Sequence, residues 1–305
     1  MTELQHMVRP IRSAKSVAKK IAGKVWKRYD TIGAYRIRLP VNSRLPMYKR
    51  AFKLQDTPLG DVARVVRAKY PDLHAIDIGA NVGDTAALIR KAGDIPVLCI
   101  EGDSELLSIL AENAAVMGAG IAIEKSFVGA EGQAVDPALI VDRGRNASLT
   151  AAIHDEGSIK LRSLRSILED HPEFSQAKLL KTDTEGFDFD ILRQSLDFIR
   201  GSKPVIFFEY DPGLRPAESK AGLDTIGALI DAGYSDFIYY DNYGNFLIHA
   251  KAQQLNILTD LHNYLASNRA FGVAVYYFDV CAFHEQDADL ALELRRSSPA
   301  YAHWQ

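Results

Sequence analysis

The chain of 305 residues carries a formal net charge of −3, with 47% hydrophobic and 25% charged residues, which is typical of a globular protein with a large core. It has no apolar run near the roughly 20 residues that span a bilayer and no apolar secretory segment at its N-terminus, so we expect a cytoplasmic protein. Cys99 and Cys281 fall in apolar, strand-like runs and are expected to be reduced core residues.

The first 50 residues are strongly basic, with thirteen Lys or Arg and two acidic residues. Within them, Ile11–Tyr29 has an apolar stripe at helical spacing, flanked by lysines. Two interpretations stay open for this predicted helix: a solvated helix packed on the main domain, or an arm that contacts an anionic membrane or a polyanionic substrate. A nucleic acid partner is not expected, because no aromatic-interleaved binding motif accompanies the lysines. We predict a basic helical extension over residues 1–55.

From residue 56 onward, the pattern alternates between helices and apolar strands. A helix is predicted over 59–69, followed by strand, turn and helix in "HAIDIGANVGDTAALIRKAG". Next come a strand in "PVLCIEGD", a helix in "SELLSILAENAAVMG" with Ser104 as its N-cap, and a strand in "GIAIEKSFVG". This order predicts parallel strands joined by crossover helices, which is a doubly wound α/β sheet with helices on both faces.

The second half of the chain begins with an irregular stretch over 130–176 that contains one short helix before Pro172. The α/β pattern then returns with a strand in "AKLLKTD", a helix in "FDFDILRQSLDFI", a strand in "PVIFFEYDP" and a helix near 219–232. A strand, turn and strand follow in "DFIYYDNYGNFLIH", then a helix and a late strand in "GVAVYYFDVCAF". We predict one α/β domain over 56–284, with a late antiparallel strand, and a C-terminal helical tail over 285–305.

A glycine turn lies where the first strand of this sheet meets its helix. In "DIGANVGD", Gly79 and Gly83 permit tight turns and close backbone approach to a ligand. Asn81 occupies the position where the dinucleotide fingerprint has its second glycine, which disfavours NAD and favours a nucleoside without a pyrophosphate. Glu101 ends the next strand, where a carboxylate accepts hydrogen bonds from a ribose diol.

Four stretches together resemble the FkbM-type family of S-adenosylmethionine-dependent methyltransferases. "AIDIGANVGDTA" resembles motif I of these enzymes, and "CIEGDSELLSILAEN" resembles the acid and helix that follow it. "LLKTDTEGFDFDIL" resembles the family's K-x-D-x-E-G segment, and "KPVIFFEYDP" is similar to its next strand, which ends in glutamate. The resemblance covers roughly residues 70–215 and departs at Gly102, where the family usually has proline.

The resemblance implies a Rossmann-like methyltransferase sheet that moves a methyl group from S-adenosylmethionine, usually to oxygen. The acceptor it implies is a small molecule or glycan: a hydroxyl of a sugar, a glycolipid or a secondary metabolite. The methionine end of the donor would lie on Asp77, Gly79, Asn81 and Gly83, the ribose on Glu101, and the adenine near Asp103, Ser126 and Phe127. Asp183 would face the sulfonium.

Three carboxylates are the candidates for catalysis. Asp183 and Glu185 follow one predicted strand and Glu209 ends the next, so the three should meet at the edge where open α/β sheets bind ligands. Like charges at one rim repel unless a cation or proton joins them, and the sulfonium and Lys181 are candidate cations. Acids at a helix start are also stabilised by the helix dipole, which explains Glu185 equally well and predicts that Asp188 and Asp190 lie in a solvated first turn.

Other polar residues are weaker candidates for a functional site. No histidine completes a ligand spacing, so no metal site is predicted. His154 is a candidate base in a loop, although a lone loop histidine is more often simply exposed. Five strand tyrosines are expected on the sheet surface more than in an acceptor pocket: Tyr239, Tyr240, Tyr243, Tyr276 and Tyr277.

Two alternatives to a methyltransferase stay open. The first is a nucleoside-binding fold that has lost catalysis and serves as an interaction module, and the second is an NAD-dependent oxidoreductase, which Asn81 weakens. The sequence makes no prediction of oligomeric state.

Overall fold

The computed structural model describes residues 27–54, 57–135, 159–215, 220–268 and 275–298. The predicted helix over Ile11–Tyr29 lies almost wholly outside these residues, and so does His154. In the described ranges, no helix has the length and apolar character needed to cross a membrane.

The centre of the molecule is an eight-stranded sheet with the strand order β11-β10-β12-β9-β8-β3-β4-β5. Its strands are β3 (Ala75–Ile78), β4 (Val97–Ile100), β5 (Ile121–Glu124), β8 (Leu179–Thr182), β9 (Val205–Tyr210), β10 (Tyr234–Asp241), β11 (Phe246–Lys251) and β12 (Phe278–His284). The five strands from β9 to β5 in this order pair in parallel, whereas β12 pairs antiparallel with both β9 and β10, and β10 pairs antiparallel with β11. The predicted doubly wound, mostly parallel sheet with a late antiparallel strand is confirmed.

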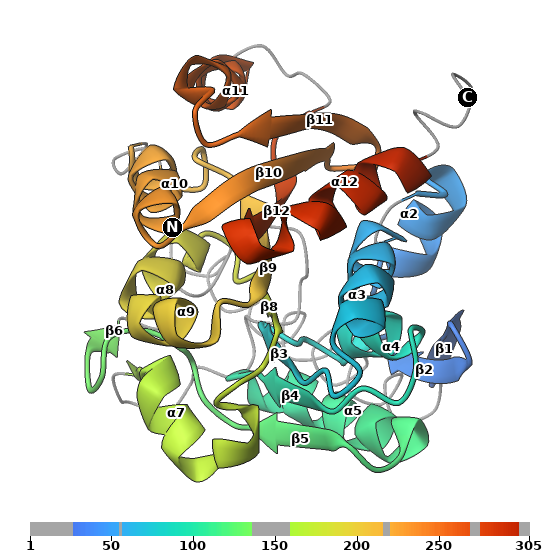
Figure 1. Cartoon of the computed structure of the whole chain (residues 1–305). Coiled ribbons are helices and arrows are strands. Elements are labelled where there is room, and N and C mark those ends of the chain that lie inside the picture. The colour runs from blue at the N-terminus through green and yellow to red at the C-terminus, as the bar shows by residue number, and fades with distance from the viewer. Residues whose placement is uncertain (1–26, 55–56, 136–158, 216–219, 269–274, 299–305) are drawn as a thin grey trace, which may run out of the picture.

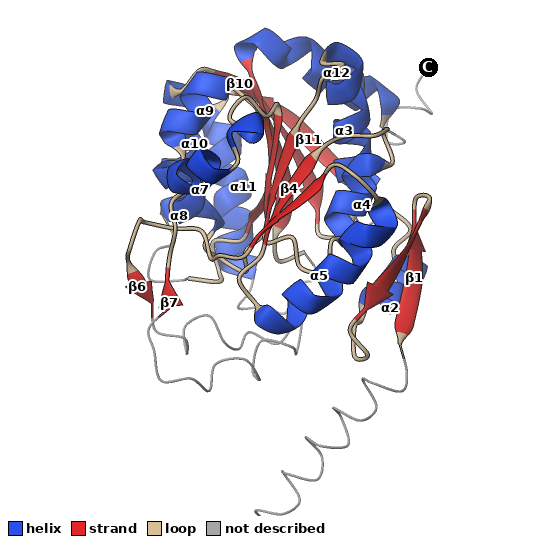
Figure 2. Ribbon diagram, turned by 90° about the horizontal axis from the view of Figure 1, so that it is seen from below, coloured by secondary structure: helices blue, strands red, loops and turns tan. Residues whose placement is uncertain are grey.

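Helices cover both faces of the sheet, as Figures 1 and 2 show. They are α2 (Leu45–Ala51), α3 (Thr57–Lys69), α4 (Asp84–Arg90), α5 (Ser104–Met117), α7 (Leu164–Asp170), α8 (Asp188–Gln194), α9 (Leu196–Ser202), α10 (Ala221–Asp231), α11 (Leu255–Asn268) and α12 (Ala288–Ser297). Short 3₁₀ turns span Pro172–Phe174 and Glu285–Asp287. Strands β3, β4, β8 and β9 are buried along their whole length, because helices cover both faces of a parallel sheet.

Two apolar cores lie on the two faces of the sheet. One packs α3, α4, α5 and α12 together, with Val62, Leu110 and Leu290 among its fully or nearly buried residues. The other packs α7 to α11, with Ile191 and Leu229 at its centre. These apolar stripes, spaced at helical intervals, hold each helix against the sheet.

The N-terminal part of the described chain differs from the predicted helical extension over 1–55. Residues 28–39 form an antiparallel hairpin of β1 (Arg28–Ile32) and β2 (Tyr35–Leu39), and only α2 is helical. Ile32, Ile37 and Leu39 alternate with exposed or half-buried residues and enter the core beside α4 and α5. That alternation has a period of two, which is typical of a strand, and the basic residues between these positions concealed it. A second, two-residue pairing joins β6 (Ala134–Val135) to β7 (Ile159–Lys160).

Two smaller expectations are also wrong. The helix predicted over "FDFDILRQSLDFI" is two helices, α8 and α9, which meet at Ser195. The N-cap of α5 is Asp103 and not Ser104, because the Asp103 carboxylate accepts from the backbone N–H groups of Glu105 and Leu106. Ser104 is the first helical residue.

The strand order places a topological switch at β3. From β3 the chain moves outward to β4 and β5, and later returns to β8 and β9 on the other side. Crevices at such a switch, beyond the carboxyl ends of the strands, are where open α/β sheets bind ligands.

Candidate active site

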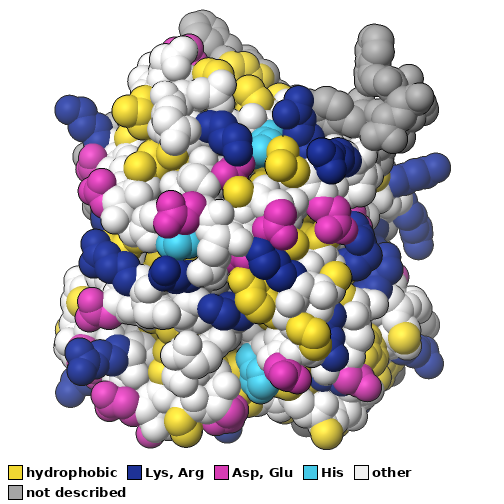
Figure 3. All heavy atoms as spheres, viewed as in Figure 1, with side chains coloured by type: hydrophobic (Ala, Val, Ile, Leu, Met, Phe, Trp, Pro, Cys, Tyr) yellow, Lys and Arg dark blue, Asp and Glu magenta, His cyan; other side chains and the backbone are white. Residues whose placement is uncertain are grey.

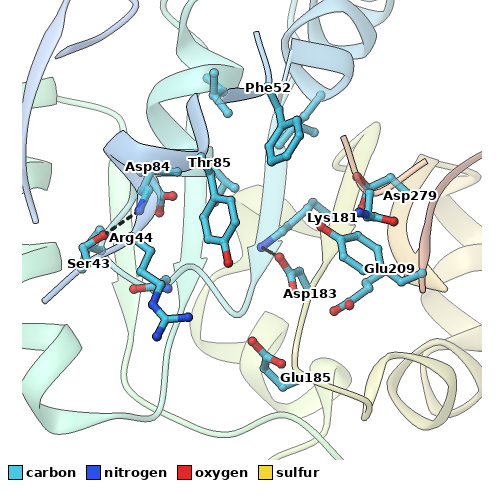
Figure 4. A pocket seen from close by; sticks show the side chains of 18 of the residues that line it. Ser43, Arg44, Phe52, Asp84, Thr85, Lys181, Asp183, Glu185, Glu209 and Asp279 are labelled. Carbon is cyan, nitrogen blue, oxygen red and sulfur yellow. Dashed lines mark hydrogen bonds and ion pairs between the residues drawn. The ribbon is translucent and has the colours of Figure 1, made fainter. Parts of the chain in front are cut away.

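A pocket opens at this carboxyl edge, with about 1430 Å³ of empty space that includes its opening to solvent. Its floor comes from the ends of β8, β9 and β12, and its walls come from the first turns of α4, from α2, and from the β10–β11 turn. Figure 4 shows Asp183, Glu185 and Glu209 around one space, with Ser43 and Arg44 across from them. Of the predicted site residues, the pocket lining includes Asn81, Asp183, Glu185 and Glu209.

The glycine turn and the acidic loop are in direct contact. Asp183 N–H donates to the carbonyl of Ile78 at 3.1 Å, which extends the pairing of β3 and β8 past their ends. Gly79 has a φ of +73°, and a Cβ built on it would lie 2.0 Å from the carbonyl oxygen of Asp183. Only glycine fits there, because both the left-handed backbone and the close approach exclude a side chain.

Lys181 links these two segments by charge. Its ammonium lies 3.0 Å from Asp77 Oδ1 and donates to the Gly79 carbonyl at 3.0 Å, while Asp183 is 4.0 Å away. Both Lys181 and Asp77 are buried, and Asp77 Oδ2 accepts from the Thr85 hydroxyl at 2.6 Å. Burial lowers the pKa of Lys181, but the attraction of Asp77 and Asp183 outweighs it and leaves the pKa above its ordinary value. The lysine is therefore a fixed positive charge beneath the glycine turn.

Glu101 faces the other side of the same turn. Its carboxylate accepts from the N–H of Asn81 at 2.9 Å and from the N–H of Asp103 at 2.8 Å. Asn81 adopts the left-handed conformation, with a φ of 51°, which directs its N–H to this carboxylate. Burial raises the pKa of Glu101 to about 7, although the hydrogen bonds from Asp103 and Asn81 oppose the shift.

The residues predicted near an adenine gather around Gly102. A Cβ on Gly102 would lie 2.3 Å from the ring of Phe127, so this ring occupies the space that a side chain at position 102 would need. Phe127 therefore excludes a proline at position 102 in this arrangement. Asp103 Oδ1 caps α5, while its buried Oδ2 and the buried hydroxyl of Ser126 have no hydrogen-bond partner among the described residues. Gly83 forms the left-handed N-cap of α4.

The three candidate catalytic acids differ in environment. Asp183 is half exposed, at 50% of its side chain, whereas Glu209 is buried. Burial, together with repulsion from Asp183, Asp188 and Glu185, raises the pKa of Glu209 well above its ordinary value. Glu185 is exposed and holds a φ of 54°, a conformation that costs a residue other than glycine about 1–3 kcal/mol and is frequent at functional sites.

The prediction of a solvated first turn is wrong for Asp188. Its side chain is buried and accepts from the Thr184 N–H at 3.2 Å, so it supports the acidic loop from within. Burial, and then repulsion from Asp183, raises the pKa of Asp188 to about 6. Asp190 is half-buried and pairs with Arg193 and Arg215.

Several pocket residues were not predicted. Asp84 and Asp279 join the lining, and burial raises the pKa of Asp84 to about 6. The wall formed by Asn42–Arg44, Tyr48 and Phe52 comes from the segment assigned to the extension, and no sequence pattern placed it here. Asp84 follows the glycine turn directly, and this position at the start of a helix was the one sequence feature that indicated a place in the pocket.

The expectation for the strand tyrosines is also wrong. Tyr239 and Tyr240 are buried within β10 and are not on the sheet surface. Tyr243, Tyr276 and Tyr277 line the pocket instead. Among the described residues, no three His, Cys, Asp or Glu side chains are grouped so that they could hold a metal ion.

Residues 77–235, more than half of the chain, match the family described as the methyltransferase FkbM domain. Solved structures resemble the chain more distantly. Methyltransferase FkbM from Methylobacillus flagellatus KT has 17% identity over 55% of this chain and 40% of its own, with a TM-score of 0.39. This chain therefore spans less than half of that protein.

Two further structures cover more of the chain. A TehB-like SAM-dependent methyltransferase from Corynebacterium glutamicum has 14% identity over 73% of this chain and 86% of its own, with a TM-score of 0.36. TYW2 from M. jannaschii, solved in complex with AdoMet, has 10% identity over 85% of this chain and 86% of its own, with a TM-score of 0.38. No curated protein matches this chain significantly.

Proposed function

Because the chain belongs to the FkbM methyltransferase family, we propose that it transfers a methyl group from S-adenosylmethionine to a hydroxyl of a sugar, a glycolipid or a secondary metabolite. The observation that carries this proposal is the contact of the glycine turn with the acidic loop, where position 79 has no room for a Cβ beside the Asp183 carbonyl. A donor seated on the turn then has its reactive end beside carboxylates, whose negative charge attracts a sulfonium cation.

The donor's binding residues follow from this placement. The methionine end lies along Gly79, Asn81 and Gly83, above the fixed charge of Lys181 and Asp77. The ribose hydroxyls donate to Glu101, whose carboxylate is held in place by the backbone N–H groups of Asn81 and Asp103. Phe127 and Ser126 border the adenine, and Asp103 Oδ2, which has no hydrogen-bond partner in the described part of the chain, is an acceptor for its amino group.

The chemistry is an in-line displacement. The acceptor hydroxyl oxygen attacks the methyl carbon, the bond from carbon to sulfur breaks, and its electron pair stays on sulfur to leave S-adenosylhomocysteine. The hydroxyl proton passes to a carboxylate and then to solvent. The sulfonium is a good leaving group, so the protein mainly positions the two reactants and accepts this proton.

Asp183 is our choice for the proton acceptor. It is half exposed, so it can pass a proton on to solvent, and it lies 4.0 Å from the Lys181 ammonium. Glu209 suits a different role, because burial and repulsion from Asp183 raise its pKa well above its ordinary value and so favour the protonated carboxyl, which is a hydrogen-bond donor. Glu185, on the exposed side of the loop, completes the acidic rim.

Two experiments test the proposal. Calorimetry with S-adenosylmethionine and S-adenosylhomocysteine tests the donor site, and absence of binding by both at high micromolar concentration would refute it. Incubation with labelled S-adenosylmethionine and a fractionated lysate of the source organism then tests transfer, with a labelled product of the hydroxyl-bearing classes as the expected result. Labelling of protein or nucleic acid alone would contradict the acceptor class.

A further inference from the structure

The candidate pocket has two chemically different sides. Figure 4 shows Arg44 and Asp84 on one side of the space, with Asp183, Glu185 and Glu209 across from them, and all five residues line the pocket. Arg44 is the last residue before α2, and Asp84 is the first residue of α4, directly after the glycine turn. The side formed by Arg44 and Asp84 therefore adjoins the turn on which the proposed donor sits.

Charged side chains on this protein usually lie beside opposite charges. On the face seen in Figure 3, acidic and basic side chains are interspersed. In the segment around Arg44, Arg38 pairs with Glu112, and the Lys49 ammonium lies 2.9 Å from the Asp30 carboxylate. Arg44 differs, because its guanidinium makes no ion pair or hydrogen bond with any described residue. Its N–H donors therefore remain available to a molecule in the pocket.

Lys181, the other basic residue of the pocket lining, is already occupied. Its ammonium lies 3.0 Å from Asp77 Oδ1 and donates to the carbonyls of Gly79 at 3.0 Å and Ile78 at 3.5 Å. An ammonium has three N–H donors, so these contacts use them all. Arg44 is therefore the basic residue of the lining that can bind an anionic group of a ligand.

Asp84 supplies an acid on the same side of the pocket. It is half-buried, and burial raises its pKa to about 6, although the attraction of Lys181 opposes the shift. Asp77 and Asp183 repel its charged form, so a further cation would stabilise this carboxylate. Asp84 forms no ion pair with Arg44 or with any other described residue. Two opposite charges thus face one space without neutralising each other.

The donor ends in a group with the matching charges. S-adenosylmethionine has an α-amino acid group, with a carboxylate and an ammonium on one carbon, joined to the sulfonium by a short methylene chain. A guanidinium binds a carboxylate through two parallel N–H bonds, and a carboxylate accepts from an ammonium. The reverse placement would bring the donor's carboxylate towards Asp183, where like charges repel.

We propose that Arg44 and Asp84 hold the α-amino acid end of the donor: the Arg44 guanidinium binds its carboxylate, and the Asp84 carboxylate accepts from its ammonium. The methionine chain is then anchored at the wall formed by α2 and α4, and the sulfonium is directed towards Asp183. This inference rests on the proposed function, because it assigns residues to a donor bound at the glycine turn. It also gives the segment before α2 a direct part in donor binding.

Three ligands that share the nucleoside and the sulfur test the inference. They are S-adenosylhomocysteine, its decarboxylated analogue, which keeps the amine, and 5′-methylthioadenosine, which lacks the whole α-amino acid group. Calorimetry with the full chain near neutral pH measures each affinity in the parent and in Arg44→Met. We expect the change to weaken S-adenosylhomocysteine at least about tenfold, which corresponds to about 1.4 kcal/mol, and to leave the other two ligands unchanged. Arg44→Lys, which keeps the charge but not the planar fork, should recover part of the loss.

Asp84→Asn tests the other half of the assignment. It should weaken the two amine-bearing ligands about fivefold and leave 5′-methylthioadenosine unchanged. Arg50→Met, exposed on α2, and Asp61→Asn, exposed on α3, are the controls and should change none of the three affinities. Unchanged binding of 5′-methylthioadenosine also shows that each variant is folded.

Full affinity for S-adenosylhomocysteine in Arg44→Met, or an equal loss for all three ligands, would overturn the inference. Unchanged affinities in Asp84→Asn would overturn the assignment of the ammonium. Because Arg44 is exposed, its replacement leaves the core intact and decides the inference even where Asp84→Asn is unstable. Failure of S-adenosylhomocysteine to bind the parent chain refutes the proposed function and the inference together, whereas normal binding by the parent with either of the Arg44 results above refutes the inference alone.

Discussion

The backbone of Asp183 lies so close to Gly79 that a single methyl group between them would be 2.0 Å from the Asp183 carbonyl oxygen. The two residues are 104 positions apart in the chain, at the ends of the adjacent parallel strands β3 and β8. Their contact couples the proposed donor turn to the proposed catalytic loop, so that a change in one displaces the other.

Gly79→Ala tests this contact. A left-handed backbone costs a residue with a side chain about 1–2 kcal/mol, and the clash with a backbone carbonyl adds a cost typical of overpacking, about 1–3 kcal/mol. We expect a loss of at least about 2 kcal/mol in the free energy of unfolding, measured in urea, together with weaker binding of S-adenosylhomocysteine. Gly201→Ala is the control, because a Cβ there meets nothing within 4 Å and α9 should gain slightly in stability. Equal effects of both changes would contradict the contact.

Asp183→Asn separates proton transfer from donor binding. If Asp183 accepts the hydroxyl proton, turnover should fall about 10²–10⁴-fold while the Kd for S-adenosylhomocysteine stays within about threefold of the parent value. Asp197→Asn, an exposed change at the start of α9, should leave turnover unchanged. Weakened donor binding with proportionate loss of turnover would assign Asp183 to orienting the donor.

Lys181→Met leaves the carboxylate of Asp77 buried without its cation. Breaking a buried pair in this way costs about 3–5 kcal/mol, so the urea midpoint should fall markedly. The double variant Asp77→Asn/Lys181→Met should recover a large part of the loss, because no uncompensated charge remains. Lys125→Met, at an exposed position, is the control and should have little effect. Additive losses in the double variant would show that the pair does not act as a unit.

The pKa of Glu101 makes donor binding depend on pH. Burial raises this pKa from its usual 4.5 to about 7, and only the carboxylate accepts from both ribose hydroxyls, so affinity for S-adenosylhomocysteine should rise between pH 6 and 8. The stability of the ligand-free protein should change with pH in the opposite direction to the affinity. The contribution of Glu101 to the free energy of unfolding is fully present below about pH 4.5 and is lost as the pH rises through about 7. Calorimetry across this range measures the first effect and urea unfolding the second. Glu101→Gln should flatten both profiles, while Glu105→Gln, exposed on α5, should preserve them.

The basic N-terminal segment gives a prediction about lipid binding. Because each lysine near an anionic surface contributes about 1 kcal/mol, neutralising four of them should reduce partitioning onto anionic vesicles by at least about a hundredfold. The full-length test variant changes Lys15, Lys19, Lys20 and Lys24 to Gln. The control variant changes Lys53, Lys91, Lys125 and Lys160, which are exposed in the structure. Equal co-sedimentation of the two variants would remove the membrane hypothesis, which otherwise stays a proposal.

A truncation near residue 55 cannot test that hypothesis. Such a change would delete the β1–β2 hairpin, which enters the core through Ile37 and Leu39, and the α2 wall of the pocket. Substitution of lysines in the intact chain avoids this loss.

Much of the fold was readable from the sequence because its determinants are local. Apolar runs such as "AIDI" and "VIFF", separated by helical stripes, predict a doubly wound sheet, and strand ends such as Glu101 and Glu209 follow from that pattern. The hairpin over 28–39 was missed, because its basic exposed residues hid a period of two. The burial of Asp188 was missed as well, because its environment depends on the loop that folds over it.

The sequence by itself therefore determined the main order of sheet strands and crossover helices from residue 56 onward, the glycine turn and the acids that follow parallel strands, since each depends on residues close together in the chain. Only the tertiary structure decided that Lys181 pairs with Asp77, that Phe127 fills the space above Gly102, and that α2 faces the β10–β11 turn across the pocket. These contacts join segments far apart in sequence, and they set burial, and through burial the pKa of each carboxylate, which no local pattern encodes.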